Sequence, residues 1–282
     1  MEDIMNLKVI ILDIDGTLFN SQKTISERTK KALLDAQSRG VKLILASGRP
    51  ITSMEPVMHE LEMDKHHGLL VAFNGASVMD CETREIVYNK AMSKEEAKSV
   101  LNHLKNFDLI PMIAHEGVMY VNDVFKGMLS YKGQQINIIE YESRGGKYTL
   151  CEKKDLAEFV DFPLNKILIA GDPEYLKENH KKVSEPFEGK LSSMFTAAFY
   201  YEFTAQNVDK ANALYEVLVP MGIQPEDTIS FGDGQNDLSI IKFAGLGVAM
   251  GNAVEELKNA ANEVTLSNDE DGIALVVERY LK

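Results

Sequence analysis

Four short segments of the chain follow one pattern, because each is wholly or nearly wholly apolar and is followed by a polar residue or a glycine. They are Val9–Leu12, Leu43–Ala46, Leu69–Phe73 and Ile229–Phe231. Strands with one face in water alternate in polarity, whereas continuous apolar runs are typical of strands buried on both faces of a parallel sheet. The pattern therefore predicts a parallel sheet covered by helices, although a set of unrelated core strands would look the same.

The segment between the first two runs has the signals of a helix. Ser26 can cap its start, apolar residues follow at helical spacing around Leu33, and Gly40 stands where a C-cap belongs. A strand, a helix and a strand within about 40 residues predict a right-handed parallel crossover. Because ligands bind outside the carboxyl ends of parallel strands, the polar residues there should converge on one edge of the sheet. These residues are Asp13, Ser47, Asn74 and Asp233.

The chain changes character after Asn74, where the strand and helix signals no longer continue the first sheet. The signals are a capping box at Ser93–Glu96 that opens a helix to about Phe107, a hairpin of Ile110–Ala114 and Val118–Val121, a strand at Lys166–Ala170, a helix start at Asp172-Pro173, and one or two strands in Leu191–Thr204. A helix at about Asp209–Met221 then resumes the first pattern. We expect an α/β protein with a Rossmann-like, doubly wound core of residues 1–76 and 204–282 and an inserted α/β cap domain of residues 77–203.

Composition and charge favour a globular protein and argue against one that binds nucleic acid. The chain has 30 Lys and Arg against 43 Asp and Glu, a formal net charge of −13, and 45% of its residues are hydrophobic. These values are ordinary for a globular protein, and the acidic balance argues against a nucleic-acid partner, which needs a basic surface. The same charge repels small anions, so any phosphate site must be locally positive or contain a cation.

The two cysteines, Cys81 and Cys151, have neither metal-ligand nor redox spacing, which favours a reducing compartment. The apolar runs fall far short of the ~20 residues of a membrane span, and the first residues do not resemble a signal peptide. We therefore expect a cytoplasmic protein without a membrane partner. The sequence predicts no particular oligomeric state.

The segment Asp13-Ile14-Asp15-Gly16-Thr17 places two carboxylates two positions apart at a strand end. One carboxylate can attack phosphorus as a nucleophile, and the second can protonate the leaving oxygen and later activate water. An Asp-Gly pair is also common in plain turns, so the motif alone leaves both interpretations open.

The segment Gly232–Asp237 supplies Asp233 and Asp237 at another strand end. Clustered acids repel one another unless a cation lies among them, and Mg²⁺ suits one or two carboxylates together with water and phosphate oxygens. A Ca²⁺ turn is the alternative, but the remaining acids of an EF-hand loop and its closing Glu are missing.

Lys210 is expected in the first turn of a helix, where a cation is unfavourable unless it points to solvent or binds an anion. Taken alone, the residue is better explained as a solvated lysine. Ser47-Gly48-Arg49 adds a hydroxyl, a backbone N–H and a guanidinium at a strand end, all suited to phosphate oxygens, with a plain turn before Pro50 as the alternative.

With these residues in this order, the chain resembles the haloacid dehalogenase superfamily, and within it the Cof-type phosphatases that carry a large α/β cap. The core motifs of that superfamily match Asp13–Thr17, Ser47–Arg49, Lys210 and Gly232–Asp237. Two further segments are similar to the subfamily, Asn74–Ala76 and Asn268–Gly272. The chain departs from the expected pattern at Ala211, where the family has Gly after the motif lysine.

The resemblance implies a role for each motif residue. Asp13 would attack phosphorus to form an aspartyl-phosphate, and Asp15 would act as general acid and then as general base. Mg²⁺ would be held by the carboxylates of Asp13 and Asp233 and by the main-chain carbonyl of Asp15, with Asp237 orienting the metal waters or Lys210. The residues implied to bind the substrate phosphate are Ser47, Gly48, Arg49, Lys210, Asn74 and Asn236.

The expected function is that of a Mg²⁺-dependent phosphatase acting on a small phosphorylated metabolite, in the first place a sugar phosphate, with the inserted domain closing over the substrate. A phosphosugar mutase, an enzyme with a similar core and cap, is the first alternative. A non-catalytic phosphosugar-binding regulator is the alternative from a different class. Binding alone does not require a nucleophile backed by a second acid, so Asp13, Asp15 and Lys210 together favour an enzyme.

Overall fold

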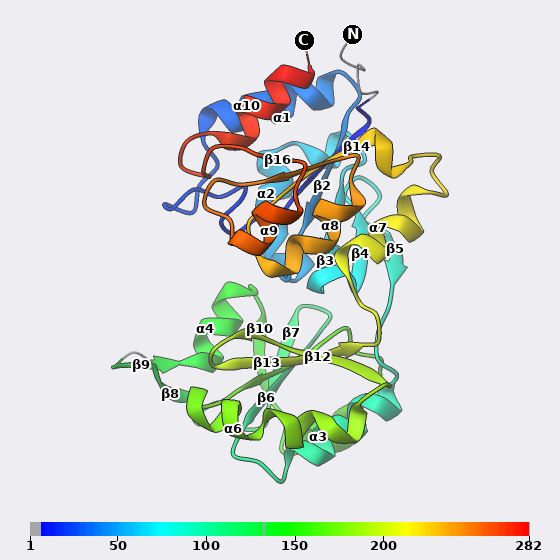
Figure 1. Cartoon of the computed structure of the whole chain (residues 1–282). Coiled ribbons are helices and arrows are strands. Elements are labelled where there is room, and N and C mark those ends of the chain that lie inside the picture. The colour runs from blue at the N-terminus through cyan, green and yellow to red at the C-terminus, as the bar shows by residue number, and fades with distance from the viewer. Residues whose placement is uncertain (1–6, 132, 282) are drawn as a thin grey trace. The chain divides into compact units, whose positions relative to one another are not determined.

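The structure, a computed structural model, describes residues 7–131 and 133–281. It divides into a first unit of Met1–Asn89 and Asp209–Lys282 and a second unit of Lys90–Val208 (Figure 1). The second unit therefore begins at residue 90, whereas the sequence suggested residue 77. The difference arises because β4 (Ser77–Asp80) and β5 (Ile86–Asn89) extend the sheet of the first unit by antiparallel pairing.

The first unit is built on a sheet in which β1 (Val9–Leu12) lies between two parallel neighbours, β14 (Thr228–Gly232) and β2 (Lys42–Ala46). Within the described residues the strand order is β16-β15-β14-β1-β2-β3-β4-β5, with β3 at Leu69–Ala72, β15 at Leu246–Ala249 and β16 at Glu263–Val264. The predicted parallel core is confirmed. The strands β1, β3 and β14 are fully buried, as expected from their largely apolar sequences.

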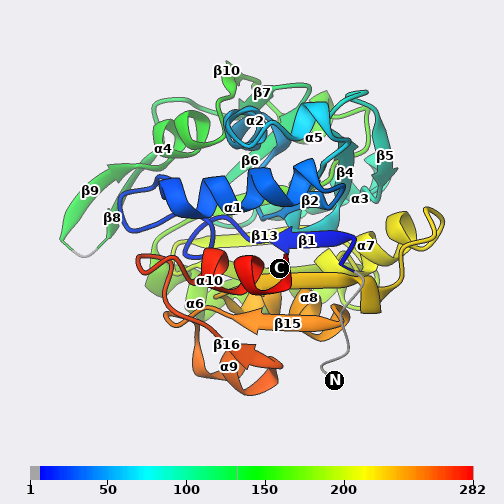
Figure 2. The ribbon, with the colours of Figure 1, turned by 90° about the horizontal axis from the view of Figure 1, so that it is seen from above.

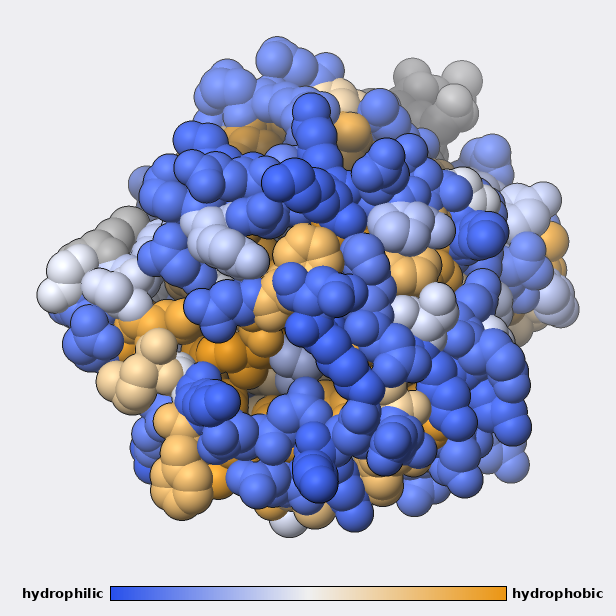
Figure 3. All heavy atoms as spheres, turned by 90° about the horizontal axis from the view of Figure 1, so that it is seen from below, coloured by the Kyte–Doolittle hydropathy of each residue, from blue (hydrophilic) through white to orange (hydrophobic). Residues whose placement is uncertain are grey.

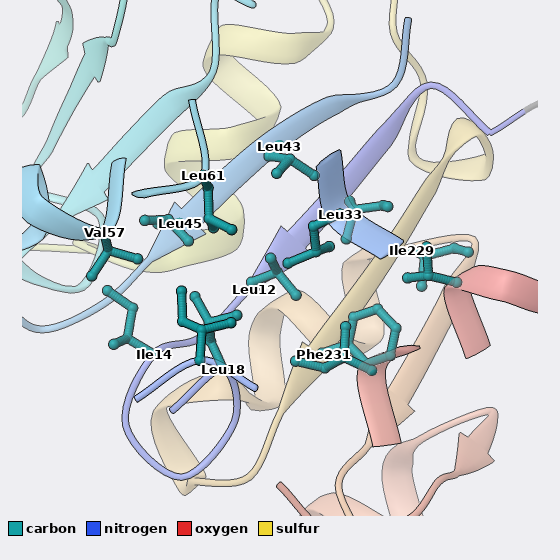
Figure 4. Packing of buried hydrophobic residues seen from close by; sticks show 14 of the residues in the cluster. Leu12, Ile14, Leu18, Leu33, Leu43, Leu45, Val57, Leu61, Ile229 and Phe231 are labelled. Carbon is teal, nitrogen blue, oxygen red and sulfur yellow. The ribbon is translucent and has the colours of Figure 1, made fainter. Parts of the chain in front are cut away.

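Helices cover both faces of this sheet. On one face Leu12, Leu45 and Phe231 pack with side chains of α1 (Glu27–Ser38), α2 (Ile51–Glu60) and α10 (Gly272–Tyr280) (Figure 4). On the other face Val9, Ile11 and Ile44 pack with α7 (Lys210–Leu218) and α8 (Leu238–Phe243). A short helix, α9 (Glu255–Ala260), follows β15. This is the doubly wound arrangement that the sequence predicted.

Helices α1 and α10, which come from opposite ends of the sequence, lie side by side on the first of these faces (Figure 2). Ser26 caps α1 by accepting a hydrogen bond from the Thr29 N–H at 3.1 Å, and Gly40 follows the helix end with a φ of +87°. Both signals were correctly predicted from the sequence. The pairing of the two helices could not be, because it joins segments more than two hundred residues apart.

The second unit has its own sheet and core. In the described part of this unit the strand order is β10-β7-β6-β11-β13-β12, with β6 at Ile110–His115, β7 at Val118–Val121, β10 at Thr149–Glu152, β11 at Ile167–Ala170, β12 at Leu191–Ala197 and β13 at Tyr200–Ala205. Its strands are antiparallel except for the β10–β7 pair. The predicted hairpin of β6 and β7 is confirmed.

Helices α3 (Lys94–Leu104), α5 (Leu156–Phe159) and α6 (Pro173–Ser184) contribute to the core on one face of that sheet. The capping box of Ser93 and Glu96 opens α3 as predicted. On the other face lies α4 (Ile138–Gly145), preceded by a ribbon of β8 (Met128–Tyr131) and β9 (Gln134–Asn137). Neither α4 nor the ribbon was predicted.

The face of the molecule shown in Figure 3 is mostly hydrophilic, with smaller apolar areas between the polar side chains. Among the exposed large apolar residues of the second unit are Phe125, Met128 and Tyr141, at 89%, 55% and 58% exposure. None of the helices in the described part of the chain is both long and apolar enough to span a membrane.

Candidate active site

The loop after β1 carries the first pair of acids. The Asp13 N–H donates to the Phe231 carbonyl at 3.1 Å, which extends the pairing with β14, and the Phe19 N–H then closes a turn on the Ile14 carbonyl at 2.8 Å. Gly16 makes this turn with a φ of +87°, and a Cβ at that position would lie 2.4 Å from the Asp233 Oδ2 atom. Only glycine lets this loop pass so close to the carboxylate of Asp233, in the loop that follows β14.

The loop after β14 carries the second pair of acids in a tight turn. Asp237 belongs to a short 3₁₀ helix, Gln235–Asp237, and its Oδ2 atom accepts hydrogen bonds from the Asp233 N–H at 3.0 Å and the Gly234 N–H at 2.9 Å. A Cβ on Gly232 would lie 2.5 Å from the Cβ of Asp237. The turn therefore fixes the Asp237 carboxylate at the edge of the sheet beside Asp233.

Lys210 is the first residue of α7 and is only 1% exposed. Its Nζ donates to Asp13 Oδ1 at 2.8 Å and to Asp237 Oδ1 at 2.7 Å, so the buried ammonium joins the loops of β1 and β14. The explanation of a solvated lysine is therefore wrong. A cation in the first helical turn opposes the helix dipole, and two charge-assisted hydrogen bonds offset that cost here.

The start of α7 can lie at this edge because the turn after β3 has a glycine where the two segments come closest. Gly75 has a φ of +102°, and a Cβ there would lie 2.2 Å from the Asp209 carbonyl oxygen. Asp209 caps α7 by accepting hydrogen bonds from the Ala211 and Asn212 N–H groups at 2.9 and 3.1 Å. The glycine after Asn74 is thus required for the close approach that brings Lys210 to the aspartates.

Asp13, Asp233 and Asp237 form a cluster in which one carboxylate oxygen of each lies within 4.8 Å of the others. Burial raises the pKa of Asp13 to about 8, because the loss of solvent outweighs the attraction of Lys210 and Asp237 repels its charge. Burial also raises the pKa of Asp233 above its usual range. Burial alone would lower the pKa of Lys210, but Asp13 and Asp237 raise it, so the amine stays charged.

The charges of this cluster do not balance. The carboxylates of Asp13, Asp233 and Asp237 carry three negative charges when ionised, and Lys210 supplies a single positive charge. The raised pKa of Asp13 expresses the same imbalance, since a proton is one way to relieve it. A divalent cation would relieve it better, and carboxylate oxygens are the ligands that a hard cation prefers.

Thr17 is a site residue that the sequence analysis did not single out. Its Oγ1 donates to Asp233 Oδ1 at 2.7 Å, which holds that carboxylate in one orientation. Thr17 is 1% exposed, so the hydroxyl acts away from solvent. The available signal was its place directly after the Asp-x-Asp-Gly sequence, but its partner is 216 residues away.

The residues expected to bind phosphate lie on loops that the structure brings together. The Ser47 N–H donates to the Val71 carbonyl and the Asn74 N–H donates to the Ser47 carbonyl, both at 2.9 Å. The Asn236 amide donates to Asn74 Oδ1 at 3.2 Å, which joins this pair to the loop after β14. A Cβ on Gly48 would lie 3.2 Å from the Asn74 amide nitrogen. The convergence predicted for strand ends is therefore confirmed.

Asp15 and Arg49 form a two-pronged ion pair at this edge. The guanidinium donates from Nε to Asp15 Oδ2 and from Nη2 to Oδ1, both at 2.6 Å. Its central carbon also lies 5.6 Å from the centre of the Phe19 ring. The Asp15 side chain is 54% exposed, so this acid faces solvent while Asp13 is enclosed. The two neighbouring acids thus occupy contrasting environments.

Comparisons with known proteins agree with this geometry. A family model described as haloacid dehalogenase-like hydrolase matches residues 10–277. The putative phosphatase YxeH of Bacillus subtilis is 30% identical over 275 residues, which cover 97% of this chain and 98% of that protein. The phosphatase YcsE of the same species, named for 5-amino-6-(5-phospho-D-ribitylamino)uracil, is 27% identical over 284 residues, 99% of this chain and 98% of its own length.

The fold has solved counterparts as well. The crystal structure of a haloacid dehalogenase-like hydrolase from Bacteroides thetaiotaomicron has a TM-score of 0.87 and 34% sequence identity, and the match covers 97% of this chain and 99% of that one. The family match, the relatives and the buried cluster of aspartates and lysine point to the same class of enzyme. The chain therefore belongs to the haloacid dehalogenase-like hydrolase family and is a phosphomonoester hydrolase of that family.

Proposed function

We propose that the protein hydrolyses sugar phosphates and similar small phosphomonoesters through an aspartyl-phosphate on Asp13, with Mg²⁺ as cofactor. The observation that carries this proposal is the buried bridge of Lys210 between Asp13 and Asp237, with Asp233 within 4.8 Å. A purely structural lysine has no need of three surrounding acids. A phosphoryl group, by contrast, needs a nucleophile and concentrated positive charge in one place.

The donor set fits Mg²⁺. The clustered carboxylates have more negative charge than Lys210 balances, and the hydrogen bond from Thr17 fixes the orientation of one of them. We assign Asp13, Asp233 and the main-chain carbonyl of Asp15 as ligands, and Asp237 as the group that holds Lys210 and the Asp233 backbone in place. When bound, Mg²⁺ would neutralise the charge of the substrate's phosphate oxygens.

In the first half of the reaction, a carboxylate oxygen of Asp13 attacks phosphorus and the bond from phosphorus to the ester oxygen breaks. Lys210 stabilises the charge on the phosphoryl group, and Asp15 donates a proton to the departing alcohol oxygen. Asp15 suits this role because its carboxylate is half exposed and reaches solvent, while Asp13 is 5% exposed. The products of this half are the free alcohol and phosphorylated Asp13.

In the second half, Asp15, now ionised, removes a proton from water as the water oxygen attacks phosphorus. The bond between phosphorus and the Asp13 oxygen breaks, which returns the carboxylate and releases inorganic phosphate. Ser47, Gly48, Asn74, Asn236 and Arg49 are assigned to the phosphate oxygens. For Arg49 this assignment requires that it exchange its present bonds to Asp15 for bonds to the substrate.

The second unit is assigned to substrate selection. It is inserted between β5 and α7, so the chain can vary there without disturbing the strands that carry the catalytic loops. The relative YcsE is named as a phosphatase of a ribityl phosphate, which is a sugar-alcohol ester attached to a heterocycle. That substrate class is the second candidate for this chain, beside simple sugar phosphates.

The proposal is tested by phosphate release from a panel of sugar phosphates, nucleotides and phosphorylated cofactors after removal of metal with a chelator. We expect Mg²⁺ but not Ca²⁺ to restore turnover, and at least one sugar or sugar-alcohol phosphate to be hydrolysed. Asp13→Asn should be inactive, while Asp172→Asn is the matched control, because Asp172 caps α6 through acceptor bonds that Asn retains. Full activity of Asp13→Asn, or of the metal-free enzyme, would refute the proposal.

Transfer of phosphate between positions of one sugar without release would instead identify a mutase. A sugar phosphate that binds without being consumed would identify a binding protein. Product analysis by NMR distinguishes both outcomes from hydrolysis.

A further inference from the structure

Two asparagines outside the roles assigned above bind the chain on both sides of the turn that follows Asp15. The Asn252 Nδ2 donates to the Gly16 carbonyl at 2.8 Å, and the Asn268 Nδ2 donates to the Phe19 carbonyl at 2.8 Å. Both come from loops at the far end of the sequence, separated from their partners by 236 and 249 residues. The turn is therefore held by two amides rather than by its own backbone alone.

The two amides are also connected to each other. The Asn268 N–H donates to Asn252 Oδ1 at 3.1 Å. A backbone N–H can only donate and the Gly16 carbonyl can only accept, so these partners define which end of the Asn252 amide is oxygen and which is nitrogen. Asn252 thus uses both ends of its side chain.

The loop of Asn252 is fastened to the second catalytic loop. The Val254 N–H donates to the Asp233 carbonyl and the Met250 N–H donates to the Gly232 carbonyl, both at 3.0 Å. Because Asn252 lies between these two anchors, its bond ties the carbonyl of Gly16, the residue after Asp15, to the backbone of Asp233. The link holds the two aspartate loops at a set distance.

Asn268 reaches Asp15 through Phe19. Phe19 and Asp15 pair in an isolated bridge across the turn, and the Phe19 ring lies 5.6 Å from the guanidinium that binds the Asp15 carboxylate. Holding the Phe19 carbonyl therefore fixes the backbone opposite Asp15. The bonds to Gly16 and Phe19 therefore constrain the backbone of the turn that follows Asp15, and this constraint remains when Arg49 turns to the substrate.

We propose that Asn252 and Asn268 are positioning residues that hold Asp15 in place for proton donation to the leaving group. The inference rests on the proposed function, since the position of Asp15 matters only if Asp15 acts as the acid. A general acid helps most when the leaving oxygen is strongly basic, because that oxygen cannot depart without a proton. We call the bonds of Asn252 to Gly16 and of Asn268 to Phe19 the clamp. Loss of a clamp bond should therefore slow the hydrolysis of esters with poor leaving groups more than that of esters with good ones.

The test compares Asn252→Asp and Asn268→Asp with the control Asn20→Asp. Each of the first two replaces the donating amide by a carboxylate and removes the bond to Gly16 or Phe19, while the Asn252 acceptor oxygen is kept. Asn20 lies next to Phe19 but uses only its acceptor, towards Gln22 and Thr24, so the control adds the same charge without removing a bond. The readouts are kcat/KM for phenyl phosphate and for p-nitrophenyl phosphate, and the melting temperature.

We expect each clamp variant to lose about 5- to 10-fold in kcat/KM for phenyl phosphate, the effect of one hydrogen bond in the transition state. The loss for p-nitrophenyl phosphate should stay below about twofold, since its leaving group needs little protonation. The control should match the wild type for both substrates. If Asn252→Asp does not fold, Asn268→Asp decides the question by the same ratio.

Equal losses for the two substrates would overturn the proposal, because they would indicate general damage to the site. Unchanged rates would overturn it as well, and so would the same losses in Asn20→Asp, which would identify a charge effect. The proposed function fails separately, if Asp13→Asn retains turnover. A selective loss in the clamp variants together with an inactive Asp13→Asn supports both.

Discussion

The two units of the molecule differ in where their charged groups lie. In the first unit Asp13, Lys210 and Asp237 are at most 5% exposed and are bonded to one another across 197 and 27 residues of sequence. In the second unit a typical pair such as Lys105 and Asp155 lies at the surface, with side chains 47% and 25% exposed, and the enclosed pair of Lys166 and Glu202, 15% and 3% exposed, is an exception. The first unit buries charge, which is costly without partners, and the second mostly does not.

This difference agrees with the proposal that the first unit carries out the chemistry and the second selects the substrate. A buried charge cluster requires every partner to be present, so its residues and their glycines cannot change independently. Surface pairs contribute little and can be exchanged, which leaves the second unit free to differ between enzymes with different substrates. The comparison can be tested by making the same type of substitution in each unit.

The largest contrast is expected for lysine to methionine. Lys210→Met leaves Asp13 and Asp237 without their buried cation, which should lower the free energy of unfolding by about 3–5 kcal/mol and turnover by about 10²–10³-fold. Lys105→Met removes an exposed pair and should cost less than about 1 kcal/mol. Urea unfolding and phosphate release measure both. Equal destabilisation by the two variants would contradict the difference between the units.

A smaller contrast is expected for glycine to alanine. Gly16→Ala must adopt a φ of +87° with its Cβ at 2.4 Å from Asp233 Oδ2, so we expect a loss of about 1–3 kcal/mol together with reduced activity. Gly145, the last residue of α4, has no atom within 4 Å of an added Cβ. Gly145→Ala should be neutral or stabilising by up to about 1 kcal/mol. A harmless Gly16→Ala would show that the Asp13 loop is not packed against Asp233 as described.

The smallest contrast is in the reactivity of the two cysteines, and we expect no change in activity from it. Burial raises the pKa of Cys81 in the first unit to about 12, with some repulsion from Asp80, so its thiol stays protonated between pH 7 and 9. Cys151 in β10 of the second unit is partly exposed. In the native protein at pH 8, a disulfide reagent should therefore modify Cys151 rapidly and Cys81 only after unfolding. A fast reaction that persists in Cys151→Ser would mean that Cys81 is accessible.

The sequence predicted the four strands β1, β2, β3 and β14, because burial on both faces gives them nearly continuous apolar sequences. It did not place β15 and β16 in this sheet, and it assigned the segment of β4 and β5 to the inserted domain. It also predicted that Asp13, Ser47, Asn74 and Asp233 converge at one edge of the sheet. Residues that follow parallel strands are brought to the same edge by the topology alone. The residue pattern taken alone did not predict that Lys210 is buried, and only the family resemblance placed it among the phosphate-binding residues. The burial of Lys210 depends on Asp13, whose position relative to α7 is set by the whole sheet.

Three residues were given no role from the sequence for a similar reason. Thr17, Asn252 and Asn268 are ordinary surface residue types, and their partners lie more than two hundred residues away. In the second unit, α4 and the β8–β9 ribbon were missed because each is short and only partly buried, so the periodicity that marks longer elements is weak.

The central claim is that Asp13 carries the phosphoryl group during turnover. The most direct measurement is rapid acid quenching of the enzyme with excess substrate, followed by peptide mass spectrometry, in the wild type and in Asp15→Asn. We expect phosphate on the peptide of residue 13, at a higher level in Asp15→Asn because water attack is slowed there, and none in Asp13→Asn. Turnover by the wild type with phosphate on another residue, or with no phosphorylated peptide in either protein, would contradict the account.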